Sequence, residues 1–246
     1  MSRELRLLAV VRLDELLVPY LAPLASHPEV AEVVILRHAP GPPIPRAAYL
    51  CPPSAGTGPW NLVARRLRLG TRAWQAQRFD GAAAFTWAPH GWIARRIARR
   101  FGAPVHLAIP GTDLFTHARR WWLRPWILRG IRSCDTVSVT GSEHEEMLLR
   151  AGVSRDRLFV LPKGIDADRF RPTGEPPRWD VAFVGRLHDQ KRPMLWLESF
   201  ARLLRERPGS RGVVVGDGPL RARTEGEARR MRSWSDPSRF PRRASG

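Results

Sequence analysis

Apolar residues in the first 170 positions of the chain occur in short runs that alternate with longer amphipathic stretches. The runs have the length of strands and are bounded by polar or turn-forming residues. They cover Leu5–Val11, Ala31–Leu36, 82–87, 104–111, 135–141 and 157–164, with a shorter run at Ala47–Leu50. The stretches with helical spacing cover 13–26, 61–77, 89–102, 115–132 and 142–152. Strands and helices that alternate in this way predict an α/β fold with a parallel sheet covered by helices.

Several of these helices carry start and stop signals. The stretch "SEHEEMLLRAG" begins with Ser142, which we expect to be the N-cap, and its acidic residues suit the positive end of the helix dipole. Gly152 is expected to stop this helix, and Gly102 is expected to stop the helix before it.

The strand and helix pattern restarts after a linker. Residues 171–179, "RPTGEPPRW", have the composition of a connection between domains. A strand at Val181–Val184, a helix at Pro193–Glu206 and a strand at Gly212–Val215 follow. We therefore predict an N-terminal Rossmann-like domain at 1–172 and a second domain at 173–246.

The pattern does not continue after Pro219. Residues 219–246 open with a helix-like stretch but then have few aliphatic residues, many arginines and no strand. A doubly wound domain with two strands would leave both sheet edges open. We expect this tail to be irregular, and the second domain to be truncated after about one βαβ unit.

Arginine dominates the charge of the chain. There are 41 basic and 23 acidic residues, which gives a net charge of +18, and the only lysines are Lys163 and Lys191. Such a field favours polyanions, namely nucleic acid, an anionic membrane surface or phosphorylated ligands. A GC-rich coding sequence would produce the same excess of arginine, so composition leaves both explanations open.

The cysteines and the N-terminus indicate the compartment. Cys51 and Cys134 lie far apart, without the spacing of a zinc site, and predict free thiols. The first apolar run is interrupted by Glu4, Arg6 and Arg12, and the chain has no long uncharged apolar span. We expect a cytoplasmic protein, soluble or peripheral at the membrane, that binds no metal.

Two cations follow the first strand of the second domain. Arg186 comes directly after it, and Lys191 precedes a helix opened by Pro193. Ligands of open parallel sheets bind beyond the carboxyl ends of the strands, where helix N-termini also favour anions. The next strand ends in a tight turn, Gly216-Asp217-Gly218-Pro219, on the same rim. The two cations are either a solvated edge or an anion site, and the neighbouring turn favours the anion site.

These motifs together resemble the retaining glycosyltransferases of family 4. The order is "LFVLPKGIDADRFRP", then "VAFVGRLHDQKRPMLWLESFARLL", then "VVVGDGPLRA". Upstream, "VSVTGSEHEEMLLRAGV" and "APHGWIARRIARRFGAPVHLAIPGTDL" are similar to elements of the same family. The resemblance covers about residues 80–223.

The resemblance implies a GT-B fold of two Rossmann-like domains and transfer of a sugar from a nucleotide-diphosphate donor, with no cofactor. Arg186 and Lys191 would bind the diphosphate and stabilise the leaving group, in place of a metal. Gly185 would let the diphosphate approach, and Gly216, Asp217 and Gly218 would contact the donor. The acceptor would be a glycan or a lipid-linked molecule. It would face Gly111, Thr112 and Asp113, and Asp113 would also be catalytic.

The chain departs from the family pattern at four places. The Gly-rich loop usual after the first strand is absent from "VVRLDELLVP", and Lys163 stands where an Asn is common. Pro110 stands where members often carry His or Arg, and the family's Glu-x7-Glu motif is absent after Pro219. The pair Glu198 and Glu206 has this spacing but lies on the preceding helix, where we interpret it as a chance pair on a solvated face. Truncation would therefore impair transfer.

Three alternatives remain. One is a GT-B relative that does not transfer sugar, such as a sugar-nucleotide epimerase, and another is a basic nucleic-acid-binding protein, although no specific nucleic-acid motif is present. The third is the role of the segment 119–130, "RRWWLRPWILRG". It would either dock on anionic lipids or form a helix that buries Trp122, Trp126 and Ile127.

Overall fold

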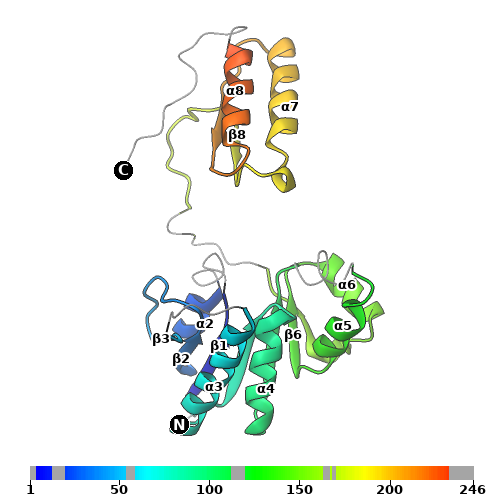
Figure 1. Ribbon diagram of the computed structural model, residues 1–246. Helices are drawn as coiled ribbons and strands as arrows, with labels where there is room; N and C mark the ends of the chain where they lie inside the picture. The colour runs from blue at the N-terminus through cyan, green and yellow to red at the C-terminus, as the bar shows by residue number, and fades with distance from the viewer. Residues whose placement is uncertain are drawn as a thin grey trace. The chain divides into compact units, whose positions relative to one another are not determined.

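The chain forms two compact units, Met1–Phe170 and Arg171–Gly246. The computed structural model describes residues 4–12, 20–53, 59–111, 120–162, 167 and 170–232 (Figure 1). The division between units falls at Phe170 and Arg171, beside the predicted boundary between 172 and 173. Each unit is described by itself.

The first unit is built on a seven-stranded parallel sheet with the order β3-β2-β1-β4-β5-β6-β7. Its strands are β1 Leu5–Val10, β2 Val30–Leu36, β3 Ala47–Leu50, β4 Gly81–Phe85, β5 Val105–Ile109, β6 Thr136–Val139 and β7 Leu158–Val160. The chain runs outward from β1 to β3 and then returns to β4 on the other side of β1. The strand order therefore reverses between β1 and β4, and the predicted α/β, Rossmann-like class is confirmed.

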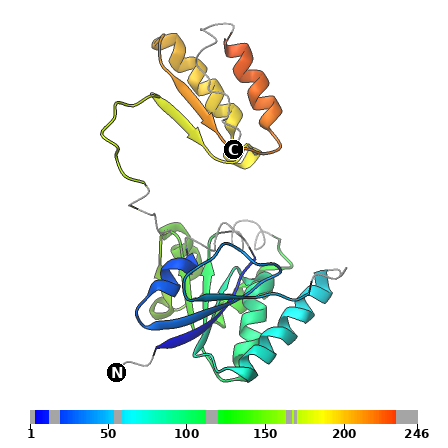
Figure 2. The same cartoon turned by 90° about the vertical axis from the view of Figure 1, so that its left-hand side faces the viewer.

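Helices cover both faces of this sheet. They are α2 Ala22–Ser26, α3 Pro59–Ala76, α4 Trp92–Arg100, α5 Arg124–Arg132 and α6 Ser142–Arg150. Alternate residues of β1 point to opposite faces, so Leu8 packs with the core under α3 to α6 and Ala9 packs with the core under α2. Figure 2 shows α2 and α3 on opposite sides of the sheet.

The predicted helix stops are confirmed, whereas one predicted start is wrong. Gly102 and Gly152 have φ values of 66° and 81°, the left-handed conformation that glycine adopts at helix ends. Gly141, with an extended backbone, occupies the cap position of α6, and Ser142 is the first helical residue.

The second unit is one βαβ element with an additional helix. It contains β8 Val181–Val184, α7 Pro193–Glu206, β9 Gly212–Val215 and α8 Arg221–Arg232. The two strands are parallel, and α7 and α8 lie side by side in both views (Figures 1 and 2).

The helix-like stretch at the start of 219–246 forms α8, so the expectation that the whole tail is irregular is wrong for 221–232. This helix buries Thr224 in place of aliphatic residues, so its sequence lacks the usual apolar stripe. The ion pairs Arg221–Glu225 and Arg230–Glu227 add support at helical spacing. Residues 233–246 lie outside the described residues.

No helix in the described ranges is both long enough and apolar enough to cross a membrane.

Candidate functional site

The loops after β8 and β9 leave the sheet at the same edge and pack on one another. Because Val184 pairs with Val215, the segments 185–187 and 216–218 run beside each other beyond the strand ends. The Gly185 amide donates to the Val215 carbonyl at 3.0 Å, and the Leu187 amide donates to the Asp217 carbonyl at 2.8 Å. These bonds extend the ladder past the two strands and fix the rim on which Arg186 lies.

Two glycines allow this close packing. A Cβ atom at Gly216 would overlap the carbonyl oxygen of Gly185, and one at Gly218 would lie 2.5 Å from the carbonyl oxygen of Leu187. Gly216 and Gly218 are therefore required by the contact between the two loops. Their role next to a nucleotide stays a prediction.

Arg186 and Lys191 are both exposed on this rim. Neither side chain forms an ion pair with a residue that the structure describes. Lys191 ends a single helical turn, Asp189–Lys191. His188, exposed and directly before this turn, caps it by accepting the Gln190 amide at Nδ1, at 3.2 Å. Pro193 then opens α7, and the side chain of Arg192, at the N-cap position, makes no capping hydrogen bond. Two cations and a free helix N-terminus are thus available to an anion.

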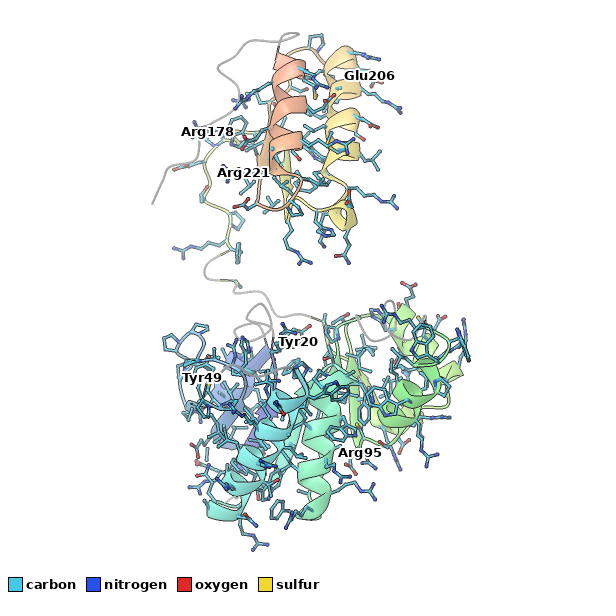
Figure 3. All side chains as sticks on the ribbon, viewed as in Figure 1. Tyr20, Tyr49, Arg95, Arg178, Glu206 and Arg221 are labelled. Atoms are coloured by element: carbon cyan, nitrogen blue, oxygen red, sulfur yellow. The ribbon has the colours of Figure 1, made fainter. Side chains whose placement is uncertain are left out.

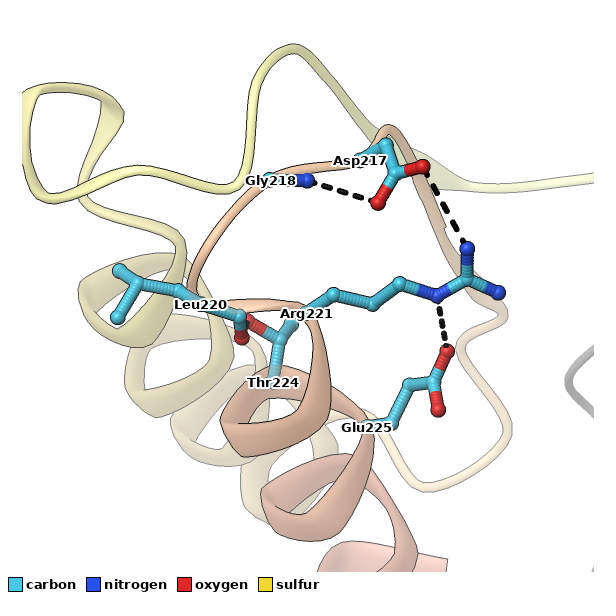
Figure 4. Close-up of polar contacts among 6 residues, drawn as sticks. All are labelled: Asp217, Gly218, Leu220, Arg221, Thr224 and Glu225. Carbon is cyan, nitrogen blue, oxygen red and sulfur yellow. Dashed lines mark hydrogen bonds and ion pairs between the residues drawn. The ribbon is translucent and has the colours of Figure 1, made fainter.

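Asp217 belongs to a polar network that joins the turn to α8 (Figure 4). One carboxylate oxygen accepts the Gly218 amide at 2.8 Å, and the other lies 3.6 Å from Arg221 Nη1. Arg221 Nε also donates to Glu225 at 2.9 Å, and this bond is the main reason that the pKa of Arg221 is raised. Asp217 therefore organises the turn, and its predicted contact with a donor remains untested.

The acceptor-side prediction falls only partly on described residues. Gly111 follows the carboxyl end of β5, is buried and has a φ of 121°. Thr112 and Asp113 lie outside the described residues. The catalytic role of Asp113 stays a prediction.

The first unit buries a group of basic side chains at the carboxyl edge of its sheet, which the sequence patterns did not predict. Arg37, directly after β2, is 1% exposed, Arg66 on α3 is 2% exposed, and His90 in the turn after β4 is 6% exposed. Arg37 Nη2 donates to the carbonyl of Arg12 at 3.2 Å, and Nδ1 of His90 lies 3.2 Å from the Thr86 hydroxyl.

The electrostatics of this group follow from burial and from its own charges. Burial lowers the pKa of His90 to about 3, with smaller contributions from Arg66 and Arg12. Burial also lowers the pKa of Arg66, helped by Arg12 and Arg37. His90 is therefore neutral at pH 7 while the arginines stay charged. Arg12 and Arg37 directly follow predicted strands, so the rule that identified Arg186 would have found them.

A basic groove of about 1130 Å³ lies on the outer face of α3, α4 and α5. Leu67, Trp87, Trp92 and Trp126 form its apolar lining. Its six arginines are Arg95, Arg96, Arg99, Arg100, Arg129 and Arg132. Figure 3 labels Arg95 on α4. Within the described part of the chain, none of the six forms an ion pair.

Two tryptophans of the segment 119–130 are more exposed than expected for a helix that buries them. Trp122 is 57% exposed and Trp126 is 42% exposed, so the predicted burial of both is wrong, whereas Ile127 is fully buried as expected. Trp121 is 80% exposed as well. Trp121 and Trp122 precede α5, which begins at Arg124, so this helix does not bury their rings.

Metal-ligating side chains and thiols do not form a reactive centre in the described ranges. No group of three or more His, Cys, Asp or Glu side chains among the described residues is placed to hold a metal. Cys51 and Cys134 are free, and burial raises the pKa of Cys134 to about 12. Metal-independent catalysis stays a prediction.

The fold and these strand-end rims define an α/β protein of the Rossmann-like, GT-B type. The sequence model of Glycosyltransferase Family 4 matches residues 22–169, which is more than half of the chain. The chain therefore belongs to glycosyltransferase family 4.

Relatives are similar over parts of their length. The chain is 30% identical over 175 residues to the putative glycosyltransferase EpsF of Bacillus subtilis, covering 64% of this chain and 45% of EpsF. It is 37% identical over 95 residues to D-inositol 3-phosphate glycosyltransferase of Nocardia farcinica, covering 32% of this chain and 20% of that protein. The matches thus span less than half the length of these curated relatives.

Solved structures share the fold. HepE of Anabaena, in complex with UDP-glucose, has a TM-score of 0.67 at 13% identity and is matched over 96% of this chain and 68% of its own. UDP-GlcNAc 2-epimerase of Neisseria meningitidis has a TM-score of 0.69 at 12% identity, covering 98% and 73%. At these identities the likeness is one of fold alone.

Proposed function

We propose that the chain transfers a hexosyl group from a nucleotide-diphosphate sugar to a glycan or lipid-linked acceptor, with retention of configuration. Arg186, Lys191 and the N-terminus of α7 bind the donor diphosphate and stabilise the charge that develops on the leaving group. Gly185, with no side chain, lets the diphosphate approach the rim. The acceptor is recognised by the first unit.

The observation that carries this proposal is the pair of exposed cations without ion-pair partners among the described residues, beside an uncapped helix N-terminus. An Arg fork and a Lys point charge suit the oxygens of a diphosphate. Membership of glycosyltransferase family 4 and the likeness to HepE, which was crystallised with UDP-glucose, support the same assignment.

Calorimetric titration of the full chain with UDP tests the donor site. Arg186→Gln or Lys191→Gln should weaken binding by about tenfold or more, since each charge-assisted bond contributes roughly 1.5–3 kcal/mol. Arg202→Gln, an exposed arginine on α7, is the matched control and should bind like the unmodified chain. Equal affinity in all three variants would show that the rim does not bind the diphosphate.

Product analysis separates transfer from epimerisation. Incubation with UDP-GlcNAc and no acceptor should leave the sugar configuration at C2 unchanged, whereas an epimerase would release the C2 epimer. The first anomer released to water, followed by proton NMR, should match that of the donor if transfer retains configuration. Inversion would contradict that part of the proposal.

A second function is favoured by the basic groove with the exposed Trp126 in its lining, and by the exposed Trp121 and Trp122 just before α5. We propose that this face docks on an anionic membrane surface at the cytoplasmic side, because interfacial tryptophans and basic residues bind anionic headgroups. Flotation with phosphatidylglycerol vesicles at low salt should recover the chain, and phosphatidylcholine vesicles should not. The variant Arg96→Gln/Arg99→Gln/Arg129→Gln should lose flotation. Retained flotation, or equal binding to DNA, would contradict lipid docking by this face.

A further inference from the structure

Arg66 and His90 hold buried polar atoms without hydrogen-bond partners in the part of the chain that the structure describes. These atoms are Arg66 Nε and His90 Nε2, on side chains that are 2% and 6% exposed. Buried polar atoms in native proteins are nearly always paired. Two such atoms in one group of residues therefore indicate a ligand that the group is built to receive.

The position of the group is the one at which open α/β sheets bind ligands. Val10, at the end of β1, pairs with Leu36 of β2 on one side and with Ala84 of β4 on the other. Arg12, Arg37 and Thr86 therefore leave the sheet at the same carboxyl edge, where the strand order reverses. Ligands of this fold bind in the crevice at that reversal.

The charge of the group specifies the kind of ligand. The charged side chains that act on Arg66 are Arg12 and Arg37, both positive, and among the described residues the one group that opposes them is the Cys51 thiol. A guanidinium stays charged in proteins, and a buried charge needs a partner of opposite sign. The described residues provide no carboxylate for Arg66, so an anion is the complement that it lacks.

His90 adds a neutral donor beside this charge. In the tautomer in which the Thr86 hydroxyl donates to Nδ1, at 3.2 Å, the ring hydrogen is on Nε2. That N–H is buried and is free to donate to an anion held by Arg66. An arginine fork together with a neutral N–H suits phosphate oxygens.

We propose that Arg66 and His90, flanked by Arg12 and Arg37, bind a phosphate group of the acceptor. The assignment to the acceptor rests on the proposed function, whereas the phosphate site itself does not.

Phosphate titration of the full chain tests the site in an Arg186→Gln/Lys191→Gln background, which removes binding at the other rim. Calorimetry should show saturable binding of inorganic phosphate, and phosphate should raise the Tm. Arg66→Met should weaken binding by about tenfold or more, since it removes a charge-assisted contact. Arg68→Met is the matched control, because Arg68 is exposed two residues along α3, and it should bind as the background does.

The Tm without phosphate distinguishes a binding arginine from a structural one. Removing an unpaired buried charge should raise the Tm of Arg66→Met, whereas loss of a structural arginine would lower it. Arg66→Lys, which keeps the charge but not the fork, should bind more weakly than the background and covers the case in which Arg66→Met does not fold. Equal phosphate affinity in the Arg66 and Arg68 variants would overturn the proposal.

Two further arms complete the experiment. The first compares the affinity for short-chain phosphatidic acid with that for inorganic phosphate. An affinity about tenfold higher for phosphatidic acid indicates a lipid phosphate, and equal affinities indicate a soluble phosphorylated acceptor. UDP binding by Arg66→Met with Arg186 and Lys191 intact should be unchanged. If Arg66→Met loses phosphate binding but the unmodified chain does not bind UDP, the proposed function is refuted and the phosphate site stands.

Discussion

Arg192 stands between Lys191 and the first turn of α7 with φ 50° and ψ 51°, in the left-handed region. A residue with a Cβ atom is disfavoured there by about 1–2 kcal/mol. We expect Arg192→Gly to raise the free energy of unfolding of the second unit by about 1 kcal/mol, measured by denaturant titration. Arg202→Gly, inside α7, should lower it by about 1 kcal/mol, because glycine weakens a helix interior. A loss of stability in both variants would show that Arg192 is not strained.

Two glycines of the second unit should respond oppositely to alanine. Gly216→Ala should destabilise the unit by about 2–4 kcal/mol, because its Cβ atom would overlap the Gly185 carbonyl oxygen. Gly226→Ala should stabilise it by about 0.5–1 kcal/mol, because Gly226 lies inside α8 with open space around it. Thermal unfolding followed by circular dichroism measures both. Similar effects of the two substitutions would rule out close packing of the loops after β8 and β9.

At the scale of elements, two histidines connect the stability of the first sheet to pH. On β5, His106 bonds both ring nitrogens to β6, Nδ1 to Thr136 at 2.9 Å and Nε2 to Ser138 at 3.0 Å, and burial lowers its pKa. His90, in the turn after β4, has a pKa of about 3 because of burial and the nearby arginines. Both folded-state values lie below the unfolded value of about 6.5.

The first unit should therefore lose stability as the pH falls below about 6.5. Below this pH His90 and His106 are protonated in the unfolded chain, whereas they stay neutral in the folded chain. The free energy of unfolding therefore falls by up to about 1.4 kcal/mol per pH unit for each histidine, until the pH reaches the folded pKa. Denaturant unfolding at pH 7 and pH 5 measures this slope. His90→Asn should flatten this slope, because it removes one of the two buried histidines. An unchanged slope for His90→Asn would exclude His90 as a source.

Most elements could be predicted from the sequence because strands buried on both faces appear as uninterrupted apolar runs. The stops at Gly102 and Gly152 were equally clear, since glycine adopts the left-handed conformation there. α8 could be recognised only as a helix-like stretch at the start of an otherwise irregular tail, because its packing uses Thr224 in place of an apolar stripe. Arg66 and His90 were missed because they come from a helix and a turn that only the folded chain brings to the sheet edge.

At the scale of the whole molecule, the two units have very different cores. The first buries both faces of a seven-stranded sheet. The second has a two-stranded sheet, with Val184 77% exposed and Val215 50% exposed. Its buried apolar side chains are chiefly Leu187, Leu197, Phe200 and Val213. A sheet of two strands with so small a core is marginally stable.

We therefore expect the second unit to open far more often than the first. Hydrogen–deuterium exchange followed by mass spectrometry should show β8 and β9 exchanging at least about tenfold faster than β1, β4 and β5, because exchange reports the free energy of local opening. UDP should slow exchange in 181–219 if the rim binds a diphosphate, since a ligand of the folded state stabilises it. Inorganic phosphate at the same concentration is the control for nonspecific binding of anions. Equal exchange rates in the two sheets would show that the small core is sufficient to stabilise the second unit. Exchange in 181–219 that phosphate slows and UDP does not would show that the rim binds anions without recognising a nucleotide.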